Sequence, residues 1–205
     1  MKESLVNRIE EVVKDIESGS SAEIVVSVRE TSDGYRDLDL LWSLIFALGI
    51  LAYKIWSPQE FHPDWILINV LFCALFGFLL SSKIAWMRRL FLTSGRRERE
   101  ATRNARSEFV RLGVGRTSGR TGLLILVSRF ERTLIMVPDL MLEQQIVPTL
   151  WEEWRRRFGS APRDEELLSN LTELLNNLKG PFSRQLPRAE NDLNELPDRP
   201  VQEKE

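Results

Sequence analysis

The chain has 205 residues, with 28 basic and 30 acidic side chains and a formal net charge of -2 at pH 7. This even balance gives no sign of the strongly basic surface that nucleic-acid binding requires, and a single cysteine excludes an intrachain disulfide. The length suits one domain with an appendage or two small domains.

The first segment predicts a helix followed by a strand. In residues 3–18, apolar side chains recur at helical spacing between Glu and Lys, and there is no early apolar stretch of the secretory-signal type. Glycine and serines end this helix, and residues 22–30, "AEIVVSVRE", are rich in β-branched side chains. We therefore expect a helix, a strand and then the loop "TSDGYRDLD".

Two apolar runs, residues 40–56 and 65–86, predict a pair of membrane-spanning helices. The second run has 22 residues and one charge, and a helix of that length covers about 33 Å, which matches a hydrocarbon core of about 30 Å. Tryptophans lie at the ends of both runs, where amphipathic rings favour the bilayer interface. The alternative is a buried helical hairpin. The predicted membrane-interface residues are Trp42, Lys54, Trp56, Trp65, Lys83, Trp86, Arg88 and Arg89.

The charges around the two runs predict their orientation. The connecting loop, "SPQEFHPD", carries Glu60 and Asp64 but no Lys or Arg, whereas seven arginines follow the second run between Arg88 and Arg106. An excess of basic residues marks the cytoplasmic side of a membrane. We therefore expect both termini to face the cytoplasm.

The remaining elements alternate between helical and strand patterns. A helix capped by Ser94 is expected to end at Gly113, and two strands, 122–127 and 133–137, form a hairpin through "SRFER". A helix over 140–158 is kinked or divided by Pro148, and another begins near Pro162 and stops at Gly180 and Pro181. The polar end of the chain is expected to be disordered.

The strand in residues 22–30 cannot form a stable sheet alone, so it must pair with the strands beyond the membrane hairpin. The hairpin is then an insertion into one α/β domain. The expected parts are 1–36 and 93–182, the two halves of that domain; 37–92, the inserted hairpin; and 183–205, the disordered tail.

The chain offers few residues for catalysis. It lacks a Cys/His pair, a Gly-x-Ser-x-Gly motif and a phosphate loop, and "RLGVGRTSG" follows a helix, which indicates a helix end and a turn. Asp139 follows an apolar strand, and together with Asp33, Asp37 and Asp39 it could hold calcium beyond the strand ends. The alternatives are that Asp139 caps the next helix and that the other three are solvated in their loop.

Eleven basic residues lie between Lys83 and Arg120, against three glutamates. This basic belt lacks interleaved aromatic residues and adjoins a predicted span. Anionic lipid headgroups therefore explain it better than nucleic acid does, at about 1 kcal/mol per basic residue near the surface.

The order of these elements resembles the TPM domain family, in particular a bacterial branch with a transmembrane hairpin after the first strand. The resemblance covers about residues 5–30 and 96–180, and its most specific part is matched by Phe109, Leu112, Gly113, Thr117, Gly122, Leu123, Leu124 and Ile125. It implies a mixed central sheet with helices on both faces and a place in the bacterial inner membrane. Asp139 matches an acidic residue that is usual after this strand in the nearest part of the family.

Family members are phosphatases, calcium binders or assembly and repair factors of membrane complexes. We expect a cytoplasm-facing, membrane-anchored binding or assembly domain without a catalytic or cofactor site, whose partners are lipid and an unknown membrane protein. The alternative is a metal-dependent, calcium-linked phosphatase. A subunit of a transporter or channel is a further possibility, although two spans without a buried acidic residue argue against an independent pore.

Overall fold

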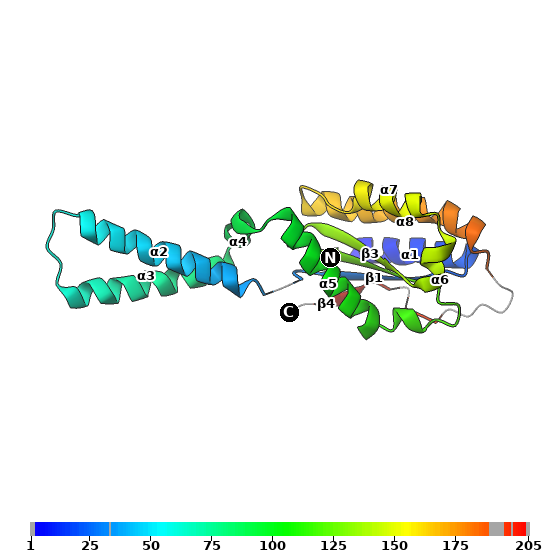
Figure 1. Ribbon diagram of the computed structural model, residues 1–205. Helices are drawn as coiled ribbons and strands as arrows, with labels where there is room; N and C mark the ends of the chain where they lie inside the picture. The colour runs from blue at the N-terminus through cyan, green and yellow to red at the C-terminus, as the bar shows by residue number, and fades with distance from the viewer. Residues whose placement is uncertain (1–2, 33, 189–194, 198, 204–205) are drawn as a thin grey trace. The chain divides into compact units, whose positions relative to one another are not determined.

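A computed structural model describes residues 3–32, 34–188, 195–197 and 199–203. The chain divides into two compact units. The α/β unit contains the chain before Gly34 and after Arg96, and the hairpin unit is Gly34–Arg96. Figure 1 shows their elements in chain order.

A four-stranded mixed sheet forms the centre of the α/β unit (Figure 1). The strands lie in the order β3-β2-β1-β4: β1 pairs in parallel with both β2 and β4, and β2 pairs antiparallel with β3. Their bounds are β1 Glu23–Arg29, β2 Gly122–Ser128, β3 Thr133–Pro138 and β4 Val201–Glu203. β1 and β2 are buried almost throughout because both faces of the sheet are covered.

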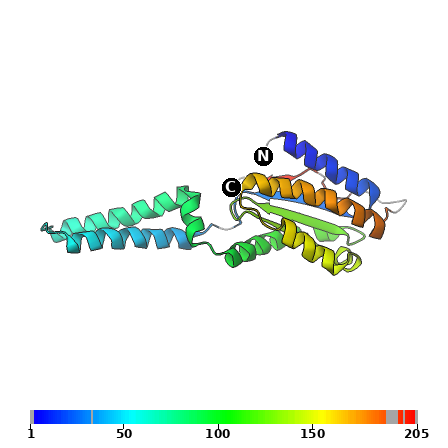
Figure 2. The same cartoon turned by 90° about the horizontal axis from the view of Figure 1, so that it is seen from above.

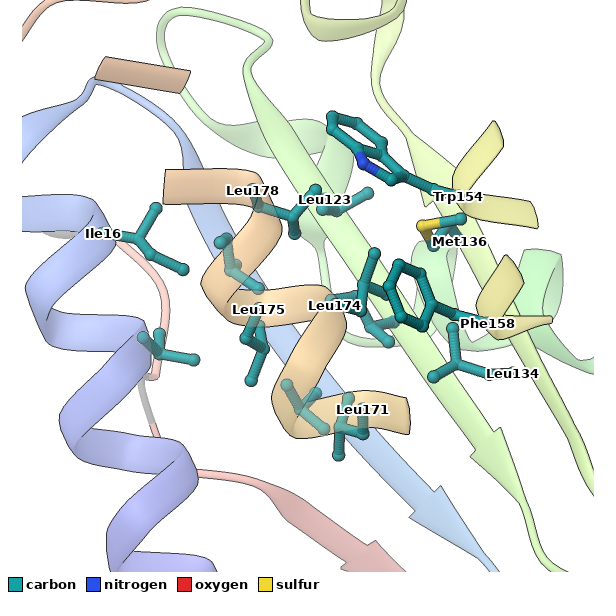
Figure 3. Packing of buried hydrophobic residues seen from close by; sticks show 14 of the residues in the cluster. Ile16, Leu123, Leu134, Met136, Trp154, Phe158, Leu171, Leu174, Leu175 and Leu178 are labelled. Atoms are coloured by element: carbon teal, nitrogen blue, oxygen red, sulfur yellow. The ribbon is translucent and has the colours of Figure 1, made fainter. Parts of the chain in front are cut away.

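Three helices cover one face of the sheet: α1 (Glu3–Gly19), α7 (Pro148–Phe158) and α8 (Asp164–Gln185) (Figures 1 and 2). Figure 3 shows Leu174 and Leu178 of α8 in the core with Trp154 and Phe158 of α7. Side chains alternate between the faces of a strand. Ile24, Val26 and Val28 accordingly point into this larger core.

Helix α5 (Ser94–Arg111) covers the opposite face with the short 3₁₀ helix η1 (Val114–Arg116). Ala105 and Val114 pack there against Val25 and Leu124, so the expected arrangement of helices on both faces is confirmed. Gly113 ends α5 in the left-handed region, with φ 69°, which a glycine adopts without steric cost.

Several predicted boundaries are wrong. Pro148 divides the helix expected over 140–158 into α6 (Leu140–Gln145) and α7. α8 does not stop at Pro181 but continues to Gln185, because Leu178 and Phe182 are buried on either side of the proline and hold the helix to the sheet. The β2–β3 connection has four residues, 129–132, rather than five.

The tail expected to be disordered contains β4, which adds a short parallel strand beside β1. Residues 186–188 of this tail are also ordered against the domain, because Pro187 forms an isolated antiparallel β-bridge with Ser20. The rest of that prediction concerns residues 189–194, 198 and 204–205, which lie outside the described part of the chain.

The hairpin unit contains two long helices, α2 (Arg36–Trp56) and α3 (Pro63–Lys83), and the short helix α4 (Ala85–Phe91). α2 begins four residues earlier than the apolar run at 40–56. The second run does not form one helix to residue 86: Ile84 is extended, with φ -109° and ψ 97°, and separates α3 from α4. Trp86 therefore belongs to α4 and not to the second predicted span.

Candidate functional site: an apolar hairpin and two polar sheet ends

Helices α2 and α3 carry large apolar side chains that are exposed within the described hairpin unit. Both are long and apolar enough to cross a membrane, and only 11% of the most apolar 18-residue window of each is buried. The alternative of a hairpin buried inside a soluble domain does not fit these exposed surfaces. The exposed side chains include Leu44, Leu48, Ile55, Leu67, Leu71, Phe72, Leu75 and Leu79.

The two helices pack against each other through aromatic rings and one glycine. Phe46 lies 6.0 Å from Phe76 between ring centroids, and Gly77 is buried where a Cβ would come within 2.9 Å of Phe46 and of the Trp42 carbonyl oxygen. Only a residue without a side chain permits this approach.

The predicted interface residues near the hairpin loop lie at the surface. Trp56 is 82% exposed and Trp65 63% exposed, at the two helix ends beside the loop. The Lys54 amine lies 3.4 Å from the centroid of the Phe61 ring, so it already makes a cation–π contact. These positions suit a bilayer interface.

At the other end of the hairpin, some of these residues contact protein. The indole of Trp42 donates a hydrogen bond to the Met87 carbonyl oxygen at 2.9 Å, so its polar edge is bound within the hairpin unit. Lys83 and Trp86 are exposed, and Arg89 is half-buried.

Arg88, which is predicted to lie at the membrane interface, binds Asp39. Its Nε and Nη2 atoms donate to the two Asp39 carboxylate oxygens at 2.8 and 2.6 Å, and the Ser81 hydroxyl donates to the same carboxylate at 2.8 Å. Asp39 is only 1% exposed and lies in α2, so the prediction of a solvated loop residue was wrong. A buried carboxylate is tolerated because several charge-assisted hydrogen bonds satisfy it.

The three described carboxylates of the predicted calcium site belong to different units: Asp139 to the α/β unit, and Asp37 and Asp39 to the hairpin unit. Asp139 follows β3 and lies beside Gly122, at the amino-terminal end of the parallel strands, with its amide bonded to the Gly122 carbonyl at 2.8 Å. Asp37 and Asp39 belong to α2, and Asp37 pairs with Arg96 at 2.6 Å. Asp33 lies outside the described residues. Among the residues that are described, no group of three or more His, Cys, Asp or Glu side chains could hold a metal.

Asp139 caps α6. Its Oδ1 atom accepts the Leu140 amide at 2.8 Å, and Arg120 donates to both carboxylate oxygens at 2.8 and 3.0 Å. Burial alone would raise the pKa of Asp139, but the hydrogen bonds from Arg120 and the Leu140 amide hold that pKa below its ordinary value. These contacts are those of the capping alternative; the calcium role remains a prediction.

A polar cluster that the sequence did not reveal lies at the carboxyl ends of β1 and β2. Glu108 on α5 is buried and accepts hydrogen bonds from Arg29 of β1 and from Arg111, the latter at 2.7 and 3.0 Å. Glu131, fully buried, accepts the Ser32 amide at 2.9 Å and the Ser128 hydroxyl. Ligands of parallel sheets bind at this edge, but here two arginines bind Glu108, and the Ser32 amide and the Ser128 hydroxyl bind Glu131.

The basic belt is partly neutralised within the chain. At least five of its eleven members form ion pairs with acidic side chains in the described part of the chain: Arg88, Arg96, Arg103, Arg111 and Arg120. The belt therefore presents less positive charge than the sequence suggests.

Comparison with known proteins supports the fold alone. No protein-family model matches the chain, and no curated protein sequence does so either. The chain is similar in structure to the BA42 protein of the psychrophilic bacterium Bizionia argentinensis, solved by NMR, with a TM-score of 0.58 and 13% sequence identity. The match covers 99% of this chain and 95% of that one.

Proposed function

We propose that the chain is a membrane-anchored α/β domain of the TPM type that faces the cytoplasm of a bacterium and binds a membrane-protein partner during assembly of a complex. The observation that carries the anchoring is the uncovered apolar surface of α2 and α3. A surface of this extent on helices of this length is stable only in lipid or against another apolar surface.

The charge pattern supports the cytoplasmic orientation. The base of the hairpin carries Arg36, Lys83, Arg88, Arg89 and Arg96, whereas the loop at the opposite end has no Lys or Arg. The rule that orients spans counts basic residues near the helix ends, so the pairing of Arg88 and Arg96 with aspartates does not weaken it.

The proposed binding role rests on the position of the hairpin, which is inserted between two strands of the α/β unit. β1 and β2 are direct parallel neighbours in the sheet. A hairpin inserted between them in the sequence connects the α/β unit to the membrane through two chain segments, one at each end of the hairpin. A domain tied in this way stays near membrane proteins that it binds, which raises its effective concentration for them.

Anchoring is tested by alkaline carbonate extraction of membranes that contain the intact protein. We expect it to stay in the membrane pellet. Phe72→Asp with Leu75→Asp should release it, because a carboxylate at the centre of a span costs roughly 3 kcal/mol and both positions are exposed, so packing within the hairpin is spared. Val110→Asp, at an exposed position of α5, is the matched control and should be retained.

The partner is sought by affinity capture of the full chain in mild detergent, read by mass spectrometry. Recovery of one stoichiometric membrane protein supports the assembly role. A clean monomer that hydrolyses phosphate esters would contradict it and favour the metal-dependent phosphatase.

A further inference from the structure

Helix α4 exposes an apolar face immediately after the second long helix. Trp86 is 63% exposed and Leu90 is 65% exposed, and a spacing of four residues puts both on one side of the helix. The helix has only seven residues, and two of them would expose a large apolar side chain to water.

The hairpin unit fixes the direction of this face. Arg88 of α4 is bound through two hydrogen bonds to Asp39 of α2, and Trp42 of α2 holds the Met87 carbonyl. Phe91 also packs edge-on against Trp42, with ring centroids 5.4 Å apart. At 3.6 residues per turn, Arg88 lies on the side of α4 opposite Trp86 and Leu90, so its bond to Asp39 turns those two side chains away from α2.

The surroundings of α4 are those of a membrane surface. The apolar surface of α3 ends at Lys83, which is exposed, and the extended Ile84 turns the chain into α4. Tryptophan favours the interface, a lysine there can reach lipid phosphate, and a short amphipathic helix lies in the interfacial plane.

We propose that α4 is an interfacial helix that lies on the cytoplasmic leaflet, with Trp86 and Leu90 inserted below the headgroups and Lys83 bound to the phosphate of an anionic phospholipid. The Asp39–Arg88 pair sets the position of α4 and is itself close to electrically neutral, which lowers the cost of placing it near lipid. This inference rests on the membrane anchoring proposed above and adds a lipid-binding element to it.

Depth measurements on the full chain test the proposal. In a Cys73→Ser background, nitroxide labels are placed singly at Phe72, Leu90 and Val110, and the protein is put into nanodiscs of phosphatidylcholine with phosphatidylglycerol. Collision with dissolved oxygen, which enters lipid, is compared with collision with a water-soluble nickel chelate. We expect the label at 72 to be deep and the label at 110 to be in water. The label at 90 should lie at intermediate depth, with oxygen collisions several-fold more frequent than at 110.

The outcomes separate this inference from the anchoring itself. A deep label at 72 with a label at 90 as open to the nickel chelate as that at 110 overturns the interfacial helix and leaves the anchor intact. A label at 72 in water overturns the anchor. In discs of phosphatidylcholine alone, the label at 90 should become shallower, and Lys83→Ala should remove this difference. Equal depth in both lipids would overturn the role of Lys83.

Two further variants test the Asp39–Arg88 pair. Asp39→Asn should release α4 and move the label at 90 into water. Asp39→Arg combined with Arg88→Asp should restore its depth, because the reversed pair keeps the attraction. An unchanged depth in Asp39→Asn would show that this pair does not position the helix.

Discussion

The buried Glu108 carboxylate and the partly exposed Arg29 form an ion pair that joins α5 to β1, on either side of the inserted hairpin in the sequence. Glu108 is 2% exposed, and both of its carboxylate oxygens are held, since Arg111 binds it as well. The pair connects two parts of the chain that lie 79 residues apart. Together with the pairing of β1 and β2, it indicates that the α/β unit is completed by contacts within itself.

The α/β unit should therefore fold without the hairpin. Asn104 of α5 donates to the Ser32 carbonyl at 3.2 Å, and Arg97 lies about 10 Å further along the same helix at roughly 1.5 Å per residue. A linker of about six Gly/Ser residues spans that distance. A chain that joins residues 1–32 to 97–205 should be soluble and unfold in one cooperative transition in urea. Its only tryptophans, Trp151 and Trp154, report on the core. Two separate transitions would show that the segments fold independently.

Removing the Glu108 carboxylate should destabilise this unit strongly. Glu108→Ala leaves Arg29 and Arg111 without their anion. Both arginines are partly exposed and can be hydrated, so we expect a cost of about 1–3 kcal/mol, the range for losing the partner of a hydrogen-bonded group. The measurement is the free energy of unfolding from urea denaturation of the shortened chain. Glu98→Ala, at an exposed position of the same helix, is the control and should change stability by less than about 0.5 kcal/mol. Equal effects of the two changes would refute a special role for Glu108.

Gly122 should tolerate no side chain. An added Cβ would come within 2.3 Å of the Val114 carbonyl oxygen, which is backbone and cannot move aside without shifting η1. We expect Gly122→Ala to cost about 1–3 kcal/mol, the range for overpacking. Gly180→Ala is the control: it lies inside α8 with open space around it, so it should stabilise the helix by up to about 1 kcal/mol. Thermal melting should show a lower melting temperature for Gly122→Ala and an unchanged or higher one for Gly180→Ala.

The sequence predicted what local patterns determine and missed what distant contacts determine. The β-branched run that ends at Arg29 formed β1, and Gly113 ended α5, because both signals lie in neighbouring residues. The Asp39–Arg88 pair spans 49 positions and has no local signal beyond an aspartate at the start of an apolar run. β4 has three residues and exists through pairing with β1, so no periodicity could have shown it.

The orientation of the hairpin predicts a clear labelling pattern. In a Cys73→Ser background, Gln59→Cys in the exposed loop should react in intact cells with a maleimide that cannot cross the membrane. Ser169→Cys, exposed on α8, should react only after the cells are opened. The reason is the excess of basic residues at the base of the hairpin over its loop. The reverse pattern would place the α/β unit outside the cytoplasm.

Asp139 provides the last test, because capping and calcium binding predict different results. As a cap, Asp139→Ala should cost about 1 kcal/mol, whereas Asp139→Asn should cost less, since asparagine caps nearly as well. Neither loss should depend on calcium. If Asp139 holds the ion, calcium at a hundredfold its dissociation constant adds about 2.7 kcal/mol to the wild type alone. Thermal melting of the three proteins in calcium and in chelator measures this. A calcium-dependent rise that Asp139→Asn abolishes would overturn the capping assignment.

The pH dependence of the Asp139 contribution follows from its contacts with Arg120 and Leu140. Because the pKa of Asp139 in the folded chain is lowered, its charged form stabilises the fold above the unfolded pKa of about 4. That contribution is lost as the pH falls through the lower folded pKa, since the carboxyl is then protonated in both states. The difference in unfolding free energy between wild type and Asp139→Asn should thus be constant near neutral pH and shrink below about pH 4. Urea denaturation of both proteins from pH 7 to pH 3 measures it. A difference that grew on acidification would mean that Arg120 does not stabilise the Asp139 carboxylate.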